Sequence, residues 1–233
     1  MTFAEHFVGD IRFLDRVLAI MNRESDQYTL LDKMTTLRDE FEELDLDHLL
    51  AEDYLDEGHA CGRKYYTVCK PGRDLLGRSL RHGPGMGDLG EKTPHKVGVR
   101  LLERWLEQQT SVTRVEPYYE HGTDTVFDVA AFDSNDELVW VGEAELASNN
   151  RKSPISDYDK MAAVDANAVW AFNSRETAIQ VIKWLAEADR LEQAVSGRET
   201  RTFSSIRDAV QDLDAAGLTT IRSFRNLDQE VGQ

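Results

Sequence analysis

The sequence predicts an α+β or α/β chain of two domains, in which a small helical domain with a β-hairpin precedes a mixed central sheet flanked by helices. Apolar residues recur at three- and four-residue steps through the first 55 residues, which is the period of amphipathic helices. Four glycines and one proline then fall within residues 81–90, a composition typical of a linker. Beyond the linker, short apolar runs of strand type alternate with helical patterns, which favours a sheet covered by helices.

The composition is that of a folded protein. Hydrophobic residues make up 41% of the 233 positions, enough for a core and too many for global disorder. No stretch approaches the roughly 20 apolar residues of a membrane span. The first ten residues lack the basic and apolar regions of a signal peptide. We therefore expect a cytoplasmic protein without membrane partners, and the sequence leaves a homodimer open.

The charge of the chain is strongly unbalanced. The formal net charge is −16, which by itself would repel nucleic acid. The 27 basic residues comprise 19 Arg and 8 Lys against 43 Asp and Glu, and this scarcity of lysine beside abundant carboxylates resembles proteins of salt-loving archaea. In such proteins the acidic surface is an adaptation to the solvent, and salt screens long-range repulsion. We therefore give local charge clusters more weight than the net charge.

Periodicity and turn residues define the elements of the first domain, residues 1–82. Amphipathic helices are predicted at residues 3–22, 30–41 and 46–55. A hairpin follows over residues 58–68, with Cys61 and Gly62 as its turn. Pro71 then begins a closing helix, because proline is favoured in the first helical turn.

Three helices, a hairpin and a closing helix are the elements of a winged helix, and residues 55–77 (LDEGHACGRKYYTVCKPGRDLLG) resemble the wing of archaeal winged helix-turn-helix proteins. The resemblance implies DNA binding. Residues 39–57 contain ten acids and no Lys or Arg, so the helix that would enter the groove is poorly suited to phosphates. The basic residues of the wing and closing helix are the predicted DNA contacts: Arg63, Lys64, Lys70, Arg73, Arg78 and Arg81. The alternative is a winged helix used for dimerisation or protein contact.

Residues 83–90 form the predicted linker, and the second domain, residues 91–195, alternates helices and strands. Thr93 is expected to cap a helix over residues 94–109. Strands are predicted at residues 112–119, 125–132, 138–146 and 168–172, and further helices at residues 156–164 and 175–188. Residues 196–233 are predicted to add a helix and a strand, at residues 204–215 and 218–224.

Carboxylates at the end of the third predicted strand of this domain indicate its chemistry. Strand alternation puts Val141, Glu143 and Glu145 on one face of a strand that is apolar along most of its length. Buried carboxylates are costly unless a cation compensates their charge. A hairpin turn at residues 133–137 would bring Asp128 of the preceding strand near Glu143. Three oxygen donors would suit Mg²⁺ or Mn²⁺, which activates water and stabilises charge on a phosphodiester.

The order helix, strand, Asp-bearing strand, Glu-bearing strand, helix, strand over residues 91–190 resembles the core of the restriction-endonuclease-like PD-(D/E)XK superfamily, including archaeal Holliday junction resolvases. The resemblance implies that Asp128 and Glu143 are the two motif acids and bind the metal. Such families often have a further acid in or ahead of the first helix, for which Glu91 and Glu103 are the candidates, and Glu91 is the predicted third metal ligand. The implied function is a DNA-associated protein with a nuclease-like domain and Mg²⁺-dependent phosphodiester hydrolysis.

One position departs from the family pattern. Glu145 stands where the family usually has a lysine that positions the attacking water or neutralises charge. Glu145 would instead add a ligand or act as a base, and Lys152 or Lys160 would supply the positive charge from the next loop or helix. The departure leaves an alternative open: a non-catalytic DNA-binding regulator, or a protein-interaction module, on a degenerate nuclease fold.

Simpler structural roles compete with the catalytic assignments. Asp128 could cap or pair at a strand end. Glu143 and Glu145 could form a solvated strand edge on an acidic surface. Glu103 is expected to be an exposed helix charge, and Glu91 an acid that favours the helix dipole.

Other common chemistries find no support in the sequence. Cys61 and Cys69 are spaced neither as CxxC nor as part of a four-ligand zinc set, so we expect free thiols. The six histidines form no HxxxH pair, which argues against a zinc hydrolase. GxGxxG occurs at residues 85–90, but it lies in the predicted linker and no predicted strand precedes it; GxxxxGK[ST] does not occur, so a nucleotide-hydrolysis loop is not predicted.

Overall fold

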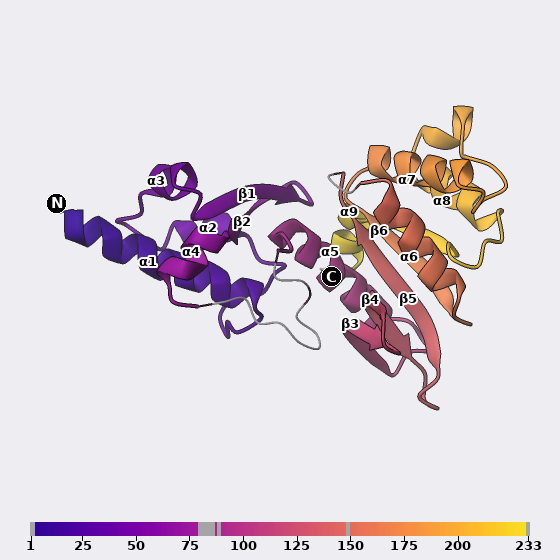
Figure 1. Ribbon diagram of the computed structural model, residues 1–233, viewed down its shortest axis with the longest axis horizontal. Coiled ribbons are helices and arrows are strands. Elements are labelled where there is room, and N and C mark those ends of the chain that lie inside the picture. Colours follow the sequence, from indigo (N-terminus) through magenta and orange to yellow (C-terminus); the bar gives the residue numbers. More distant parts are fainter. Residues whose placement is uncertain (1–2, 79–86, 88–89, 148–149, 232–233) are drawn as a thin grey trace. The chain divides into compact units, whose positions relative to one another are not determined.

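The computed structural model describes residues 3–78, 87, 90–147 and 150–231, with side chains from residue 8 onward (Figure 1). The chain forms two compact units, Met1–Val97 and Gly98–Gln233. The division falls within helix α5 (Thr93–Glu107), after the predicted linker, most of which lies outside the described residues. No described helix combines the length and the apolar character that crossing a bilayer requires.

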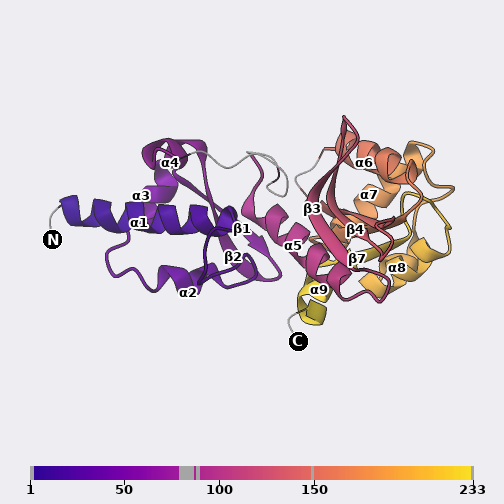
Figure 2. The same ribbon diagram turned by 90° about the horizontal axis from the view of Figure 1, so that it is seen from below.

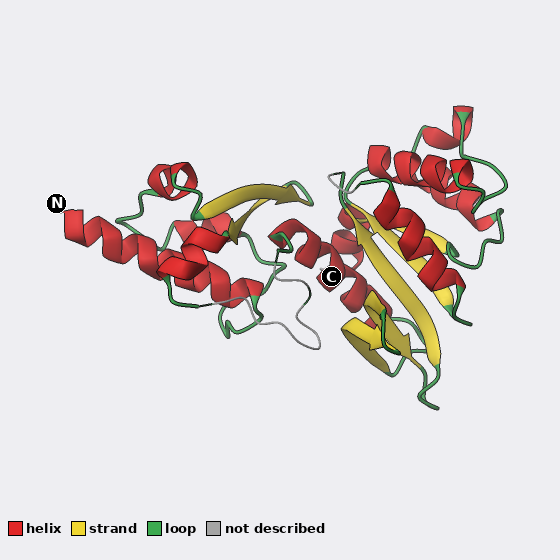
Figure 3. Ribbon diagram, in the orientation of Figure 1, coloured by secondary structure: helices red, strands yellow, loops and turns green. Residues whose placement is uncertain are grey.

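The first unit consists of short and long helices around one β-hairpin (Figure 3). Its helices are α1 (Phe3–Met21), α2 (Met34–Arg38), α3 (Leu46–Ala51) and α4 (Lys70–Leu75). Strands β1 (Leu55–Ala60) and β2 (Arg63–Val68) pair antiparallel through the predicted turn at Cys61 and Gly62. Both turn residues have positive φ, 54° and 71°, as a two-residue hairpin turn requires. The predicted order of three helices, a hairpin and a closing helix is thus present, while the winged-helix identity stays a prediction.

Two predicted helices of this unit are shorter than expected. The helix predicted over residues 30–41 is reduced to α2, because Asp32 accepts hydrogen bonds from the N–H and the Oγ1 of Thr29 and holds a turn ahead of it. The helix predicted over residues 46–55 ends with α3, because Asp53 adopts a positive φ of 55° and strand β1 follows.

The core of the first unit includes the contact between α1 and β2, where Phe13 packs edge-on against Tyr66 with ring centroids 5.7 Å apart. Thr93, predicted as a helix cap, hydrogen-bonds to β2: its Oγ1 donates to the carbonyl of Tyr66 over 2.8 Å. The start of α5 is therefore anchored to the hairpin by a side chain. Cys61 and Cys69 are not joined by a disulfide.

The second unit is built on a five-stranded mixed sheet with the strand order β3-β4-β5-β6-β7 (Figure 1). The strands are β3 (Arg114–His121), β4 (Thr125–Phe132), β5 (Leu138–Glu145), β6 (Asn167–Phe172) and β7 (Thr220–Ser223). Strands β3, β4 and β5 form an antiparallel meander, and β6 and β7 are added parallel to β5. The predicted order of one helix, three strands, one helix and one strand is confirmed at the level of elements.

Helices cover both faces of this sheet (Figures 1 and 2). Helices α6 (Lys152–Ala162), α7 (Arg175–Glu187) and α8 (Phe203–Gln211) pack on one face, over a core that includes Val141, Trp170 and Phe172. Helices α5 and α9 (Phe224–Val231) lie on the other face, where Leu102 of α5 approaches Gly142 of β5. The mixed sheet flanked by helices that the sequence predicts is therefore present.

Helix α6 begins earlier than predicted. The expected loop through Pro154 is instead the first turn of the helix, where proline is tolerated because its missing N–H has no helical acceptor. Asn150 supports this start, since its Oδ1 accepts the N–H of Lys152 over 2.9 Å. The earlier start turns the predicted loop lysine, Lys152, into the first residue of α6.

The C-terminal extension, residues 196–233, completes the core instead of standing apart from it. Strand β7 pairs with β6, with Thr220 opposite Val169. The predicted strand over residues 218–224 is shorter and leads into a helix, α9, that was not predicted. Ser223 explains this end of the strand, because its Oγ accepts the N–H of Asn226 over 3.1 Å in the manner of a helix cap.

Candidate metal-binding and catalytic site

Asp128 and Glu143 lie next to each other on neighbouring strands. Strands β4 and β5 pair with Val129 opposite Gly142, which is the register expected from the predicted hairpin. Next to this pair, toward the end of β5, hydrogen bonds between main-chain N–H groups and carboxylates connect β4 and β5. The N–H of Asp128 donates to Oε1 of Glu143 (3.3 Å), and the N–H of Ala144 donates to Oδ2 of Asp128 (2.8 Å). Each carboxylate is therefore held by the backbone of the other strand.

Glu143 and Glu145 are buried, so the alternative of a solvated strand edge is wrong. Their relative exposures are 4% and 1%. Both residues share the sheet face covered by α6 and α7, since they lie opposite Trp170 and Phe172 in the parallel register. Burial, and after it the charge of Asp128, raises the pKa of Glu143 well above its usual range.

Lys160 of helix α6 compensates the charge of Glu143. Its Nζ lies 2.8 Å from Oε1 of Glu143 and 3.0 Å from Oδ1 of Asp157. The same Nζ donates to the carbonyl of Val126 over 2.7 Å. An ammonium has three N–H donors, so these three acceptors satisfy it fully. Burial by itself would lower the pKa of Lys160, but the carboxylates of Glu143 and Asp157 outweigh burial and raise it above its usual value.

Ser153 and Asp157 also belong to this site, and neither was predicted from the sequence. Ser153, Asp157 and Lys160 recur at four- and three-residue steps along α6 and share one face of the helix. The Oγ of Ser153 donates to Oδ2 of Asp157 (3.3 Å), which leaves Oδ1 for Lys160. The spacing of Asp157 and Lys160 is the signal by which the pair could have been found once Lys160 was a candidate.

Lys152, Glu91 and Glu103 were also candidates for the site. Lys152 is exposed at the start of α6 and, among the residues that the structure describes, forms no ion pair with the site carboxylates. Glu91 belongs to the first unit, where its carboxylate pairs with His95, and its role as a metal ligand stays a prediction. Glu103 is only 7% exposed and pairs with Arg100 over 2.7 Å, so the expectation of an exposed helix charge is wrong.

Five of the six predicted DNA contacts of the first unit donate to acceptors of the chain itself. Three pair with acids: Lys64 with Glu57 (2.8 Å), Lys70 with Asp74 (2.6 Å) and Arg78 with Asp15 (2.6 Å). Two donate to main-chain carbonyls: Arg63 to Leu31 (2.7 Å) and Arg73 to Val68 (2.8 Å). Arg81 lies outside the described residues. Local acids therefore reduce the positive charge that DNA phosphates would meet on this patch.

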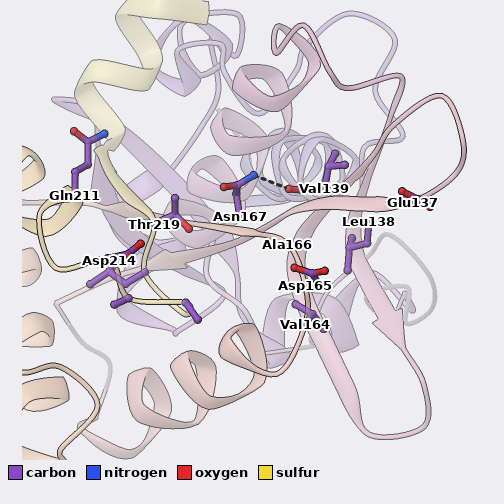
Figure 4. A pocket seen from close by; sticks show the side chains of 13 residues that line it. Glu137, Leu138, Val139, Val164, Asp165, Ala166, Asn167, Gln211, Asp214 and Thr219 are labelled. Atoms are coloured by element: carbon purple, nitrogen blue, oxygen red, sulfur yellow. Dashed lines mark hydrogen bonds between the residues drawn. The ribbon is translucent and has the colours of Figure 1, made fainter.

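A polar hollow of about 540 Å³ lies at the other end of the sheet (Figure 4). It opens beside the first residues of β5 and β6, and its acids are Glu137, Asp165 and Asp214. Glu143 lies near the opposite end of β5, so the hollow is separate from the carboxylate site. Its acidic lining does not suit a polyanion such as DNA.

The carboxylate site combines four groups that can act together. Asp128 and Glu143 offer oxygen donors, and Lys160 offers a positive charge that Asp157 helps to hold. Such a set can bind a divalent cation and place an ammonium beside it. Comparisons with protein-family models, with curated proteins and with solved structures find no match, so function is inferred from the chemistry of this site.

Proposed function

We propose that the second unit is a Mg²⁺- or Mn²⁺-dependent nuclease-like domain that hydrolyses phosphodiester bonds of DNA. The observation that carries the proposal is the meeting of Asp128, Glu143 and Lys160: two carboxylates on neighbouring strands, with a lysine 2.8 Å from the second. The chain has Glu145 where the PD-(D/E)XK pattern has lysine. Lys160, on the next helix, places its ammonium beside Glu143. This position supports the idea that Lys160 takes over the role of the lysine that the family has at position 145.

The residues fit a divalent cation. Asp128 and Glu143 present carboxylate oxygens, the donors that Mg²⁺ and Mn²⁺ prefer. The burial that raises the pKa of Glu143 also favours a cation beside it, because a bound ion compensates the lost hydration. Even with Lys160 beside them, the carboxylates of Asp128, Glu143 and Asp157 carry a net negative charge when ionised, which favours a divalent cation. Asp128 and Glu143 would hold the ion, and Glu91 stays the predicted third ligand.

Lys160 and Glu145 would have separate roles in the hydrolysis. When bound, the ion would supply positive charge to the phosphodiester and lower the pKa of the attacking water. Lys160 would stabilise the negative charge that develops on the phosphate oxygens. Glu145, buried on the same face of β5 as Glu143, would add a ligand or accept a proton from the water.

DNA association through the first unit is a further part of the proposal. Lys64 and Lys70 pair with acids, but their side chains are 35% and 77% exposed. Exposed ion pairs are weak, so a phosphate can take the place of the acid partner. We therefore expect a modest contribution to DNA binding from this patch, which salt should reduce.

The decisive experiment is cleavage of linear and branched DNA by the full chain with Mg²⁺ or Mn²⁺, in KCl from low to multimolar concentration. We expect the wild type to cut, and Asp128→Asn and Glu143→Gln to be inactive. Asp124→Asn is the matched control, because Asp124 is an exposed acid in the turn before β4. Cutting that survives the combined changes Asp128→Ala and Glu143→Ala would contradict the catalytic assignment.

A non-catalytic role is the second candidate, and one observation favours it. Lys160 by itself compensates the buried charge of Glu143, so the carboxylates have a structural explanation. The chain would then be a DNA-binding regulator or a protein-interaction module. DNA binding without cutting under every ion condition would favour the regulator, and no DNA binding at any salt would favour the interaction module.

A further inference from the structure

We infer that Asp157 is a positioning residue of the carboxylate site, which keeps the ammonium of Lys160 in place when Glu143 binds a cation. The inference rests on the proposed function and adds one residue to it. Asp157 acts through Lys160 and is not assigned a contact with substrate.

The geometry around Lys160 supports this role. Oδ1 of Asp157 lies 3.0 Å from Nζ of Lys160, beside the carbonyl of Val126 at 2.7 Å. Only 20% of the Lys160 side chain and 16% of the Asp157 side chain is exposed, so water cannot readily take over either contact. Ser153 donates to Oδ2 of Asp157 and thereby orients its carboxylate. The support therefore comes from α6 and from β4, and it does not depend on β5.

Electrostatics explains why this support is needed. Oε1 of Glu143 lies 2.8 Å from the ammonium, and a divalent cation bound to the same oxygen would repel it. When Glu143 coordinates the cation, the carboxylate of Asp157 still accepts a hydrogen bond from Lys160. Without that charge, a lysine on a flexible stem would turn its ammonium to solvent. Asp157 thus lets Glu143 change partner while Lys160 stays beside the site.

Helix α6 offers a matched control for this contact. Asp159 lies two residues further along, and its carboxylate pairs with Arg190 over 2.6 and 2.9 Å. Its side chain is 48% exposed. Asp159→Asn therefore removes the same type of charge from the same helix without touching Lys160.

Amine labelling tests the contact without any cleavage assay. The full chain is treated with limiting acetic anhydride in saturating Mn²⁺ and also without metal, and acetylation of Lys160 is measured by peptide mass spectrometry against the exposed Lys183. We expect Asp157→Asn to label Lys160 at least about threefold faster than the wild type, because a charge-assisted hydrogen bond is lost. Asp157→Glu and Asp159→Asn should label at the wild-type rate. An unchanged rate in folded Asp157→Asn overturns the inference.

A second variant keeps the test decisive if Asp157→Asn does not fold. Ser153→Ala withdraws only the hydrogen bond that orients Asp157. A rise of about twofold in the labelling of Lys160 would support the inference, given the modest strength of one neutral donor. A wild-type rate in Ser153→Ala would then overturn it.

Measuring kcat and KM separately distinguishes a positioning role of Asp157 from a general loss of structure. With an active nuclease, Asp157→Asn is expected to lower kcat about tenfold at unchanged KM, because Lys160 stabilises developing charge. Asp157→Glu should restore most of kcat. An equal loss in Asp159→Asn would overturn the specific role of Asp157. If even the wild type does not cut DNA, the proposed function fails, whereas the labelling experiment still decides whether Asp157 holds Lys160.

Discussion

Nζ of Lys160 and Oε1 of Glu143 lie 2.8 Å apart, and only 20% and 6% of the two side chains is exposed. The pair joins helix α6 to strand β5 on the sheet face that carries the main core of the second unit. Burying two charges costs hydration, and their attraction offsets this loss only while both partners are present. Removing one partner should therefore lower the free energy of unfolding more than removing both.

Replacing Lys160 by Met is expected to destabilise the second unit by roughly 3 kcal/mol, because the buried carboxylate of Glu143 loses its cation. Urea unfolding followed by tryptophan fluorescence measures this, since all 4 Trp residues lie in the second unit. Lys183→Met is the control: this lysine is 59% exposed and should cost less than about 1 kcal/mol. Equal losses in both variants would mean that the Lys160 pair is not buried in solution.

Adding Glu143→Gln to Lys160→Met should recover most of the lost stability, because no uncompensated glutamate remains beside the missing lysine. The double-mutant cycle is expected to give a coupling of roughly 1–3 kcal/mol, the range for contacting residues. The four proteins of the cycle are compared by urea unfolding at one pH. Strictly additive losses would show that Lys160 and Glu143 do not interact.

Mn²⁺ affinity should rise as the pH is raised from about 5 to about 8. Burial raises the pKa of Glu143, so this carboxyl keeps its proton to a higher pH than an exposed glutamate, and a cation must displace that proton. Calorimetry in two buffers of different ionisation enthalpy measures both the affinity and the released proton. Glu143→Gln should bind weakly and without this pH dependence. A constant wild-type affinity over the range would exclude Glu143 as a ligand with a raised pKa.

Gly217→Ala should lower the stability of the second unit by roughly 1–3 kcal/mol, because the site is overpacked. A Cβ at this position would lie 2.7 Å from the carbonyl oxygen of Tyr158. The Gly217 carbonyl also accepts Nε1–H of Trp170 over 2.8 Å, so tryptophan fluorescence reports the change directly. Ala216→Ser, at the exposed neighbouring position, is the control and should be neutral. A wild-type stability for Gly217→Ala would contradict the packing of the C-terminal extension against α6.

Local sequence patterns determined most of the helices and strands, and the pairing of Asp128 with Glu143. Strand β4 has the bounds predicted for residues 125–132, where a mostly apolar run is followed by the turn residues Ser134, Asn135 and Asp136. The same turn sets the β4–β5 register and so brings Asp128 to Glu143. These features depend on neighbours in the sequence, and the sequence was therefore sufficient to predict them.

The tertiary structure decided which lysine lies beside Asp128 and Glu143. Lys152 and Lys160 were equal candidates, but only the face of α6 that carries Lys160 is turned toward β5. That choice depends on which apolar side chains of α6 are buried against the sheet, and periodicity alone does not reveal it. Asp157 entered the site for the same reason, since it shares that face. The sequence by itself determined the strands and their acids, whereas long-range packing of one helix decided how their charge is balanced.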